Sequence, residues 1–435
     1  MWRVWILFLL GCTLFCGTGA LAQEMTLKEA LERALVQSPE IKKAELSLLV
    51  AQSRLRGARE DTFSPTVAIG ERIGLLGMLQ GGFSLQLKDT ISFDSSLWEE
   101  AKVNLEKAQR SLKATQDEVT RKVIVSYLGV LKTERELFLA KKNLEFYKAK
   151  LERLKEEYAK GEAASSLLKE AEGKWREAET LVAHLEAQVR LSKETFFALL
   201  GEAMEGDVSF APLPEFVLSL PEEATLLDFV VLSDTIEDLE GQRRVLEATF
   251  SHLRRKERPH IALEGTYAKD GWSFSLAYDF TQKSLDVALE KPFTSFGSAS
   301  EDFGVGLVIS WSFSPTLGEE KKQIELQREM LLLDLEKAKR DVLLNIREKY
   351  FAVLKAKGVL ESKKVLLEAQ REVFESRRKQ FDLGALDSIA LLESEIGFLS
   401  AQKEYEDARC SYLESFLDFL RAIEEPLSWE TLFAS

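Results

Sequence analysis

The stretch Tyr127-Leu-Gly-Val-Leu-Lys132 recurs later in this chain as Tyr350-Phe-Ala-Val-Leu-Lys355. We call the spacing between Tyr127 and Tyr350 the repeat interval. Gly161 and Gly384 are separated by the same interval. Chance readily produces one matching hexapeptide, but it does not readily produce a constant interval over such a length. The chain is therefore expected to be a tandem duplication.

The two copies differ in length before the hexapeptide. Thr26-Leu27 resembles Thr225-Leu226, and this spacing is shorter than the repeat interval. The second copy is therefore expected to contain about 20 to 25 additional residues, between about residues 269 and 303. The predicted units are a first repeat at 23–221, a second repeat at 222–425 and a C-terminal tail at 426–435.

Long helices are expected to form most of each copy. No proline lies between Pro65 and Pro212 or between Pro315 and Pro426, and both stretches are rich in Leu, Ala, Glu and Lys. Each copy is expected to contain a helix, short β segments, a very long helix, a turn and another long helix.

The longest helix of the first copy is expected from about Trp98 to about Lys160, where Gly161 interrupts it, after a first helix from about Leu27 to Asp61. It would span about 95 Å, which is too long for the core of a globular domain. Its apolar residues alternate steps of three and four, the pattern of a coiled-coil seam. A solvated coiled-coil scaffold would explain this seam equally well. The seam residues are Leu137, Ala140, Leu144, Tyr147, Leu151, Leu154 and Tyr158.

Two segments, residues 83–94 and 303–314, alternate in hydrophobicity with a period of two. Their length and pattern are typical of barrel strands that face lipid on one side and water on the other. A soluble β-sandwich is the alternative, but the first copy offers only two strands, the other being the alternating segment Pro65–Leu75, and the faces opposite the apolar ones carry small side chains. A two-stranded hairpin has open edges, and unpaired backbone groups in lipid cost several kcal/mol each. Several chains are therefore expected to close one barrel together.

The additional residues of the second copy alternate as well. They form the segments Trp272–Phe280 and Leu285–Leu289, with Asp270-Gly271 as the expected hairpin turn. These segments either extend the hairpin outside the cell or add strands to the barrel wall, and the sequence alone leaves both options open.

The N-terminus has the features of a secretion signal. Arg3 precedes an apolar core, and Ala20-Leu21-Ala22 fits a cleavage site, so residues 1–22 are expected to be removed as a signal peptide. Cleavage before Cys12 would instead leave a lipidated cysteine. Either way the protein is exported, and Cys410 is the only cysteine outside the leader, so no internal disulfide is expected.

Composition argues against several classes of protein. The chain has 58 Lys and Arg against 72 Asp and Glu, and a net charge of −14 argues against a nucleic-acid partner, which needs a basic face. The three histidines, His184, His252 and His260, are scattered, and no closely spaced Cys and His residues suggest zinc. A secreted enzyme would need a polar cluster that the sequence does not show. We therefore expect no catalytic residues, metal or cofactor.

Several motifs together carry a resemblance to a known family. They are Met25-Thr-Leu-Lys-Glu-Ala-Leu-Glu-Arg-Ala-Leu35, Ser38-Pro39-Glu40, Phe63-Ser-Pro65 before the first strand, and the turn regions Tyr158–Glu172 and Phe381–Glu395. With the leader, the repeat and the long helices, they resemble the TolC-like outer-membrane efflux proteins over essentially the whole mature chain. The resemblance implies a mainly α fold with β structure. It consists of a trimeric α-helical barrel of coiled-coil hairpins, continuous with a transmembrane β-barrel of about 12 strands, about four from each chain.

The resemblance also implies a function. The chain would be the exit duct of a tripartite efflux or type I secretion system, located in the outer membrane with a long periplasmic extension. Its partners would be further copies in a homotrimer, a periplasmic adaptor, an inner-membrane pump and outer-membrane lipid. A periplasmic coiled-coil adaptor or scaffold is the alternative, although it would lack membrane-length strands. The expected adaptor contacts are the hairpin tips at Gly161, Glu162, Gly384, Ala385 and Leu386.

The tips are also the expected constriction. Family members often carry an aspartate six residues after the turn glycine, where this chain has Leu167 and Ala390. Acids occur instead nine residues after each glycine, at Glu170 and Glu393. In a threefold assembly each tip acid would form a ring that favours cations, unless these acids simply face outward. The expected gate residues are Phe381, Asp387 and Glu393.

Overall fold

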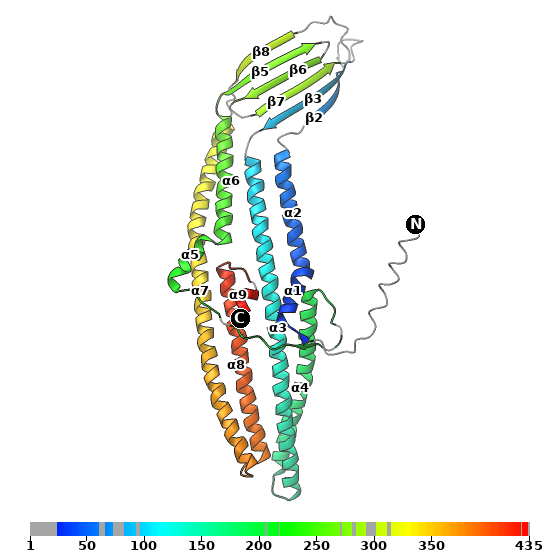
Figure 1. Ribbon diagram of the computed structural model, residues 1–435, viewed down its shortest axis with the longest axis vertical. Coiled ribbons are helices and arrows are strands. Elements are labelled where there is room, and N and C mark those ends of the chain that lie inside the picture. Colours follow the sequence, from blue (N-terminus) through cyan, green and yellow to red (C-terminus); the bar gives the residue numbers. More distant parts are fainter. Residues whose placement is uncertain are drawn as a thin grey trace, which may run out of the picture.

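The computed structural model describes residues 24–60, 66–72, 82–92, 96–204, 206, 208–216, 218–269, 272–280, 284–292, 302–310, 315–427 and 429–433. The predicted leader, residues 1–22, lies outside these residues. The described chain is a long rod, in which a β-sheet occupies one end and helices run from it to two turns at the opposite end (Figure 1).

Both halves of the chain place helices before and after their strands. The first half contains α1 (Leu27–Gln37), α2 (Pro39–Glu60), β2 (Thr66–Arg72), β3 (Gly82–Ser92), α3 (Ser96–Ala159) and α4 (Ser165–Leu200). The second half contains α5 (Leu226–Val231), α6 (Asp234–Lys256), β5 (His260–Lys269), β6 (Trp272–Asp279), β7 (Ser284–Pro292), β8 (Asp302–Ser310), α7 (Pro315–Asp382), α8 (Ser388–Ala422) and α9 (Trp429–Phe433). Two short strands, β1 (Glu24–Met25) and β4 (Ser209–Phe210), pair in parallel beside the helices.

The predicted first helix is in fact two helices, because the chain turns at Ser38. Proline excludes the residue before it from the helical region, and Ser38 has φ −54° and ψ 123° ahead of Pro39. The start of α1 is fixed by a capping box. The Glu29 N–H donates to the Thr26 hydroxyl at 3.3 Å, and the Thr26 N–H donates to the Glu29 carboxylate at 3.5 Å.

The very long helices occur as predicted. α3 has 64 residues and α7 has 68 residues, so α7 spans about 100 Å. α3 packs against α4, and α7 packs against α8, as two antiparallel hairpins (Figure 1). Within the predicted seam, Ala140 and Leu144 pack against Val182 and Leu185 of α4. None of the helices in the described part of the chain has both the length and the apolar character needed to cross a bilayer.

The main hydrophobic core lies midway along the rod and contains matching aromatic pairs from the two halves. Tyr127 of α3 packs edge-on against Phe196 of α4, with ring centroids 5.9 Å apart. Tyr350 of α7 packs against Phe419 of α8 at the same centroid distance. Each member of the second pair follows its counterpart by the repeat interval, so the repetition found in the sequence coincides with an equivalence in packing.

The Tyr127 hydroxyl makes contacts that its counterpart does not make among the described residues. It lies 2.7 Å from the carbonyl oxygen of Ala211 and 3.1 Å from that of Met25. These carbonyls belong to the segments around β4 and β1, so the hydroxyl fixes both segments to α3. Burial raises the pKa of Tyr127 and keeps its hydroxyl protonated.

The sheet contains six antiparallel strands in the order β2-β3-β7-β6-β5-β8. The expectation of about four strands from each chain is therefore wrong. The two additional segments, which the sequence could not place, lie inside the sheet as β6 and β7. Each segment is long enough to form a strand and alternates in hydrophobicity. β6 pairs with β5 and β7, and β7 pairs with β6 and β3.

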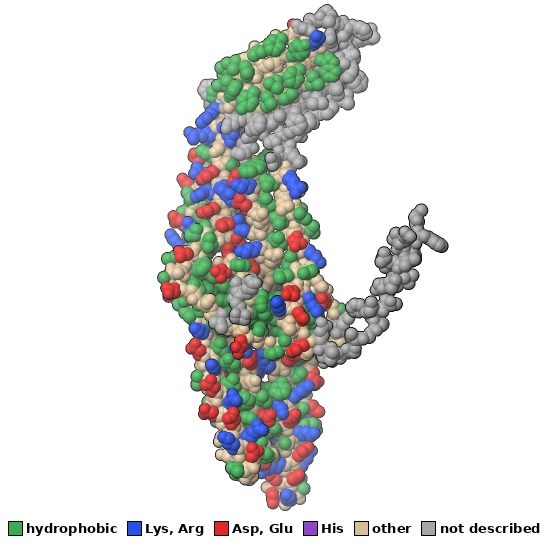
Figure 2. Space-filling view, viewed as in Figure 1, with side chains coloured by type: hydrophobic (Ala, Val, Ile, Leu, Met, Phe, Trp, Pro, Cys, Tyr) green, Lys and Arg blue, Asp and Glu red, His purple; other side chains and the backbone are tan. Residues whose placement is uncertain are grey.

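The strand register separates two kinds of residue. Successive residues of a strand face opposite sides of a sheet, so adjacent cross-strand rows belong to opposite faces. Hydrophobic side chains cover the described part of one face (Figure 2). One row across all six strands is apolar and contains Val67, Leu87, Leu289, Phe274, Tyr267 and Phe303. The adjacent row is small or polar and contains Thr66, Lys88, Ala288, Ser275, Thr266 and Gly304.

Tyr127→Phe should destabilise the protein by about 1–2 kcal/mol, because it removes the one O–H donor that the Ala211 and Met25 carbonyls share, and of the two only Met25 keeps another donor among the described residues, the Ala211 N–H. Tyr350→Phe is the matched control, since no hydrogen bond of its hydroxyl occurs among the described residues, and we expect a smaller loss. The midpoint of urea unfolding of the detergent-purified protein measures both changes. Equal losses would contradict the anchoring role of the Tyr127 hydroxyl.

Candidate functional site

Both hairpins end in the same backbone turn at the end of the rod remote from the sheet (Figure 1). Gly161 has φ 78° and Gly384 has φ 73°, in the left-handed region that favours glycine. In each turn the glycine N–H donates to the carbonyl three residues earlier, and the next N–H donates to the carbonyl five residues earlier, at 2.8–3.0 Å. This is the Schellman arrangement that ends a helix.

The predicted adaptor-contact residues lie at the surface of these turns. Gly161, Glu162, Gly384 and Ala385 are exposed, and Leu386 is partly buried. Two leucines that the sequence analysis did not select as contacts add apolar surface there. Leu383 is 83% exposed and Leu167 is 50% exposed. The tips therefore expose both apolar and charged groups.

Among the predicted gate residues, Asp387 contacts the other hairpin. Its carboxylate forms an ion pair with Arg153 of α3. The same guanidinium contacts Glu157 at 2.9 Å. Asp387 occupies the N-cap position of α8, but its side chain makes no capping hydrogen bond. Asp387 therefore ties the two hairpins together at the tip.

The other two gate residues are exposed or lack a counterion. Phe381 lies in the last turn of α7 and is 38% exposed. Glu393 lies in the second turn of α8, and within the described ranges no cation is within ion-pair distance of it and no hydrogen bond links it to Asp387. Glu170, at the matching position of α4, pairs with Lys174 at 2.6 Å. Glu393 is therefore the one of these three acids whose charge has no described counterion.

A row of ion pairs joins α3 to α8 along their contact. The helices are antiparallel, so the partners advance along α3 as they recede along α8. An exposed ion pair contributes only about 0–1 kcal/mol to stability. The whole row, however, can form only when α3 and α8 are aligned in one register. The sequence analysis missed it, although complementary charges at opposite spacing on the two helices would have been the signal. The pairs are Glu118–Arg421, Arg121–Asp418, Lys132–Glu414, Arg135–Glu406, Glu136–Lys403, Lys142–Glu395 and Arg153–Asp387.

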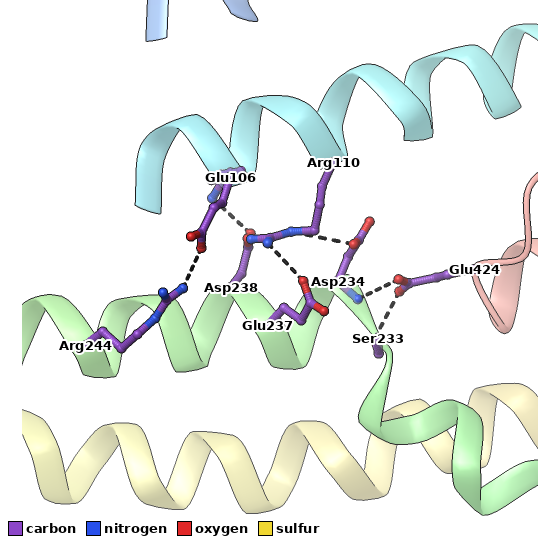
Figure 3. A network of polar contacts seen from close by, with 9 residues as sticks. Glu106, Arg110, Ser233, Asp234, Glu237, Asp238, Arg244 and Glu424 are labelled. Carbon is purple, nitrogen blue, oxygen red and sulfur yellow. Dashed lines mark hydrogen bonds and ion pairs between the residues drawn. The ribbon is translucent and has the colours of Figure 1, made fainter. Parts of the chain in front are cut away.

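A second polar network holds α6 against α3 nearer the sheet (Figure 3). Arg110 of α3 pairs with three carboxylates in the first turns of α6. Farther along, Arg244 of α6 pairs with Glu106 of α3 at 2.5 Å, and this hydrogen bond lowers the pKa of Glu106. The three acids around Arg110 are Asp234, Glu237 and Asp238.

Glu424 adds the end of α8 to this network and breaks the symmetry of the two halves. It follows Gly201, which ends α4 with φ 78°, by the repeat interval, and it has a left-handed φ of 58° itself. Its carboxylate accepts hydrogen bonds from the Ser233 hydroxyl at 3.1 Å and from the Asp234 N–H at 2.6 Å (Figure 3). Burial raises the pKa of the Glu424 carboxyl, although the Asp234 N–H opposes this rise. The backbone of Glu424 is thus strained at the position where its side chain caps the start of α6.

Comparison with known proteins identifies the second half of the chain. Residues 238–423 match the family model described as outer membrane efflux protein. The matched part is less than half of the chain. It contains α6, the strands of the second half, α7 and α8, and therefore one of the two tips. No curated protein matches the chain.

Solved outer-membrane channels share the fold of more than nine-tenths of the chain. The outer-membrane channel OprN is 17% identical, with a TM-score of 0.66 over 92% of this chain and 90% of its own. The outer membrane protein VceC from Vibrio cholerae is 14% identical, with a TM-score of 0.64 over 91% and 95%. The open state of the MtrE outer membrane channel from Neisseria gonorrhoeae is 16% identical, with a TM-score of 0.62 over 93% and 90%. The resemblance to TolC-like outer-membrane efflux proteins, predicted from the sequence, is confirmed.

Gly384→Val should reduce export without preventing membrane insertion. A β-carbon in the left-handed region costs about 1–2 kcal/mol, whereas nothing lies within 4 Å of a β-carbon built at this glycine. The distortion would therefore arise in the backbone of the tip. Gly358→Val is the matched control, because Gly358 lies within α7 with equally open space. Normal export at a normal membrane level would argue that the tip makes no essential contact.

Glu424→Ala should destabilise the protein more than Glu424→Gly, by about 1 kcal/mol. Both changes remove the hydrogen bonds to α6, but only glycine also relieves the left-handed backbone. The urea midpoints of the two variants measure the difference. Equal midpoints would mean that position 424 stores no backbone strain.

Proposed function

We propose that this chain is the outer-membrane channel of a tripartite efflux or type I secretion system, conducting substrates from a periplasmic adaptor and an inner-membrane pump to the outside. The observation that carries the proposal is the sheet at the end of the rod, where an apolar row and a small or polar row lie next to each other across all six strands. Such a sheet suits lipid on one face and water on the other. The family match of residues 238–423 supports the proposal.

The chain acts as a homotrimer. Within the described residues, β2 and β8 each pair with a strand on one side only. Their free backbone groups would cost several kcal/mol each in lipid, so further copies complete the wall. Apolar side chains exposed on α2 and α7 provide helix surfaces for the neighbouring copies to cover. They are Leu46, Leu49, Val50, Leu332, Leu333 and Leu344.

The helical part of the rod extends into the periplasm. Charged side chains of both signs cover the helices, whereas the described sheet face is hydrophobic (Figure 2). The sheet is therefore the part that enters lipid, and the helices stand in water. The hairpin tips then lie farthest from the outer membrane, where the adaptor meets them.

A periplasmic adaptor or scaffold is the second candidate, because long coiled-coil hairpins alone would serve it. That function leaves the hydrophobic sheet face without a use. The sheet thus favours the channel.

Membrane fractionation with native mass measurement in detergent tests the proposal. We expect the protein in the outer-membrane fraction and a mass of three chains. A monomer that stays in the aqueous fraction after the leader is removed would overturn the channel and favour the scaffold.

Single-channel recording in a lipid bilayer tests the acidic tip. Glu393→Gln should lower the preference for cations, because in a trimer it removes three acids without a described counterion. Asp387→Asn should lower it less, since Arg153 already neutralises that carboxylate. Glu361→Gln, at an exposed acid of α7 remote from the tip, is the control. Unchanged conductance and selectivity in both tip variants would place the constriction elsewhere.

A further inference from the structure

The residues added to the second half widen the sheet rather than lengthen it. β6 is paired with β5 along eight residue pairs, from Trp272 opposite Lys269 to Asp279 opposite Ala262. β7 is paired with β3 along nine residue pairs, up to Ser284 opposite Ser92. Both strands therefore lie level with their neighbours and form part of the wall.

The topology shows how this widening preserves the sheet. β5, β6 and β7 follow one another as neighbours, and β8 returns beside β5, which is a Greek key. Without β6 and β7 the remaining order would be β2-β3-β5-β8. Strand directions would still alternate, because an even number of strands is removed. The insertion is thus a hairpin added within an antiparallel wall.

We propose that three copies of this chain close a barrel of eighteen strands, in which β8 of one copy pairs with β2 of the next. Three six-stranded sheets give eighteen strands, where the family resemblance implies about 12. The proposal rests on the trimer of the proposed function and adds the strand number, the interface and the width of the outer mouth.

The polarity of the edge strands fits this closure. In a sheet of six alternating strands, β2 and β8 run in opposite directions. A rotation that brings β8 of one copy beside β2 of the next therefore creates an antiparallel pair. The ladder then continues around the barrel without a parallel junction.

The composition of β8 also indicates a paired strand. Free edges usually carry a lysine, a proline or an inward charge that blocks pairing. Residues 303–309 contain none of these. Side chains on both faces of β8 are exposed in the single chain, Leu307 at 63% and Val308 at 39%. Apart from Asp302 at its start, this strand lacks the features that protect a free edge, as expected for one covered by a second copy.

The strand number has a consequence for the solute. Barrel diameter grows roughly linearly with the number of strands, so eighteen strands give a diameter about 1.5 times that of twelve. Barrels of 16–18 strands leave an aqueous channel. The outer mouth would therefore pass bulky hydrated solutes, and selection by size would take place at the hairpin tips.

Disulfide trapping tests the wall and the interface separately. Lys88→Cys with Ala288→Cys places two thiols opposite each other on β3 and β7, and oxidation should form a disulfide within one chain. Lys88→Cys with Thr266→Cys is the control, because β7 and β6 separate these positions by about 14 Å. For the interface, Val308→Cys is combined in turn with a cysteine at each position of β2. At least one pair should give a covalent trimer on a non-reducing gel.

Deletion of residues 270–292 provides the second readout. Residues 293–301 then connect β5 to β8 in the sequence. Entry of polyethylene glycols from the outer side reports the mouth rather than the tip, and the largest polymer admitted should be about one third smaller in diameter than for the full chain.

The outcomes separate the two proposals. The eighteen-stranded wall would be overturned by a trimer that forms neither the disulfide between the cysteines at positions 88 and 288 nor any disulfide between β8 and β2. The proposed channel function would remain. An unchanged polymer limit in a deletion variant that still forms trimers would overturn the wide mouth. A monomer in detergent would overturn the trimer itself, and the wall with it.

Discussion

In a lipid bilayer a backbone N–H or C=O without a partner has no water to bind, and this constraint governs how the chain is organised. A single chain satisfies the backbone of four strands on both sides but leaves β2 and β8 with one neighbour each among the described residues. In the proposed trimer, the helices hold the six strands of each chain at one end of the rod, where the neighbouring copies complete the sheet. The hairpins, the midway core and the ion pairs between α3 and α8 all contribute to that arrangement.

The two halves use the same parts but are not interchangeable. Tyr127 and Tyr350 occupy matching places against Phe196 and Phe419, yet within the described ranges only the Tyr127 hydroxyl hydrogen-bonds to neighbouring segments. At the ends of α4 and α8 a glycine is replaced by Glu424, whose carboxylate caps α6. Through these differences, the first half contacts the N-terminal segment at Tyr127, and the second half caps α6 at Glu424.

Much of this architecture could be predicted from periodicity alone. The constant repeat interval and the absence of proline indicated the long helices, and the glycines marked the tips. The break at Ser38 was missed because the apolar pattern continues across Pro39. The place of β6 and β7 could not be predicted, because alternation identifies a strand but not its neighbours. Pairing of Asp387 with Arg153 was also beyond the sequence, since it depends on how two hairpins approach each other.

The position of β7 beside β3 sets the order in which the molecule can be assembled. Ser92 pairs with Ser284, so the hairpin of β2 and β3 leaves the export machinery long before the strand that completes it. Contacts so distant in sequence form slowly, and an apolar hairpin waiting in the periplasm is prone to aggregate. The helical hairpins are built from contacts much closer in sequence and can form first. The assembled helices then hold the strands of both halves at the same end of the rod. Insertion into the membrane is therefore the last step of biogenesis.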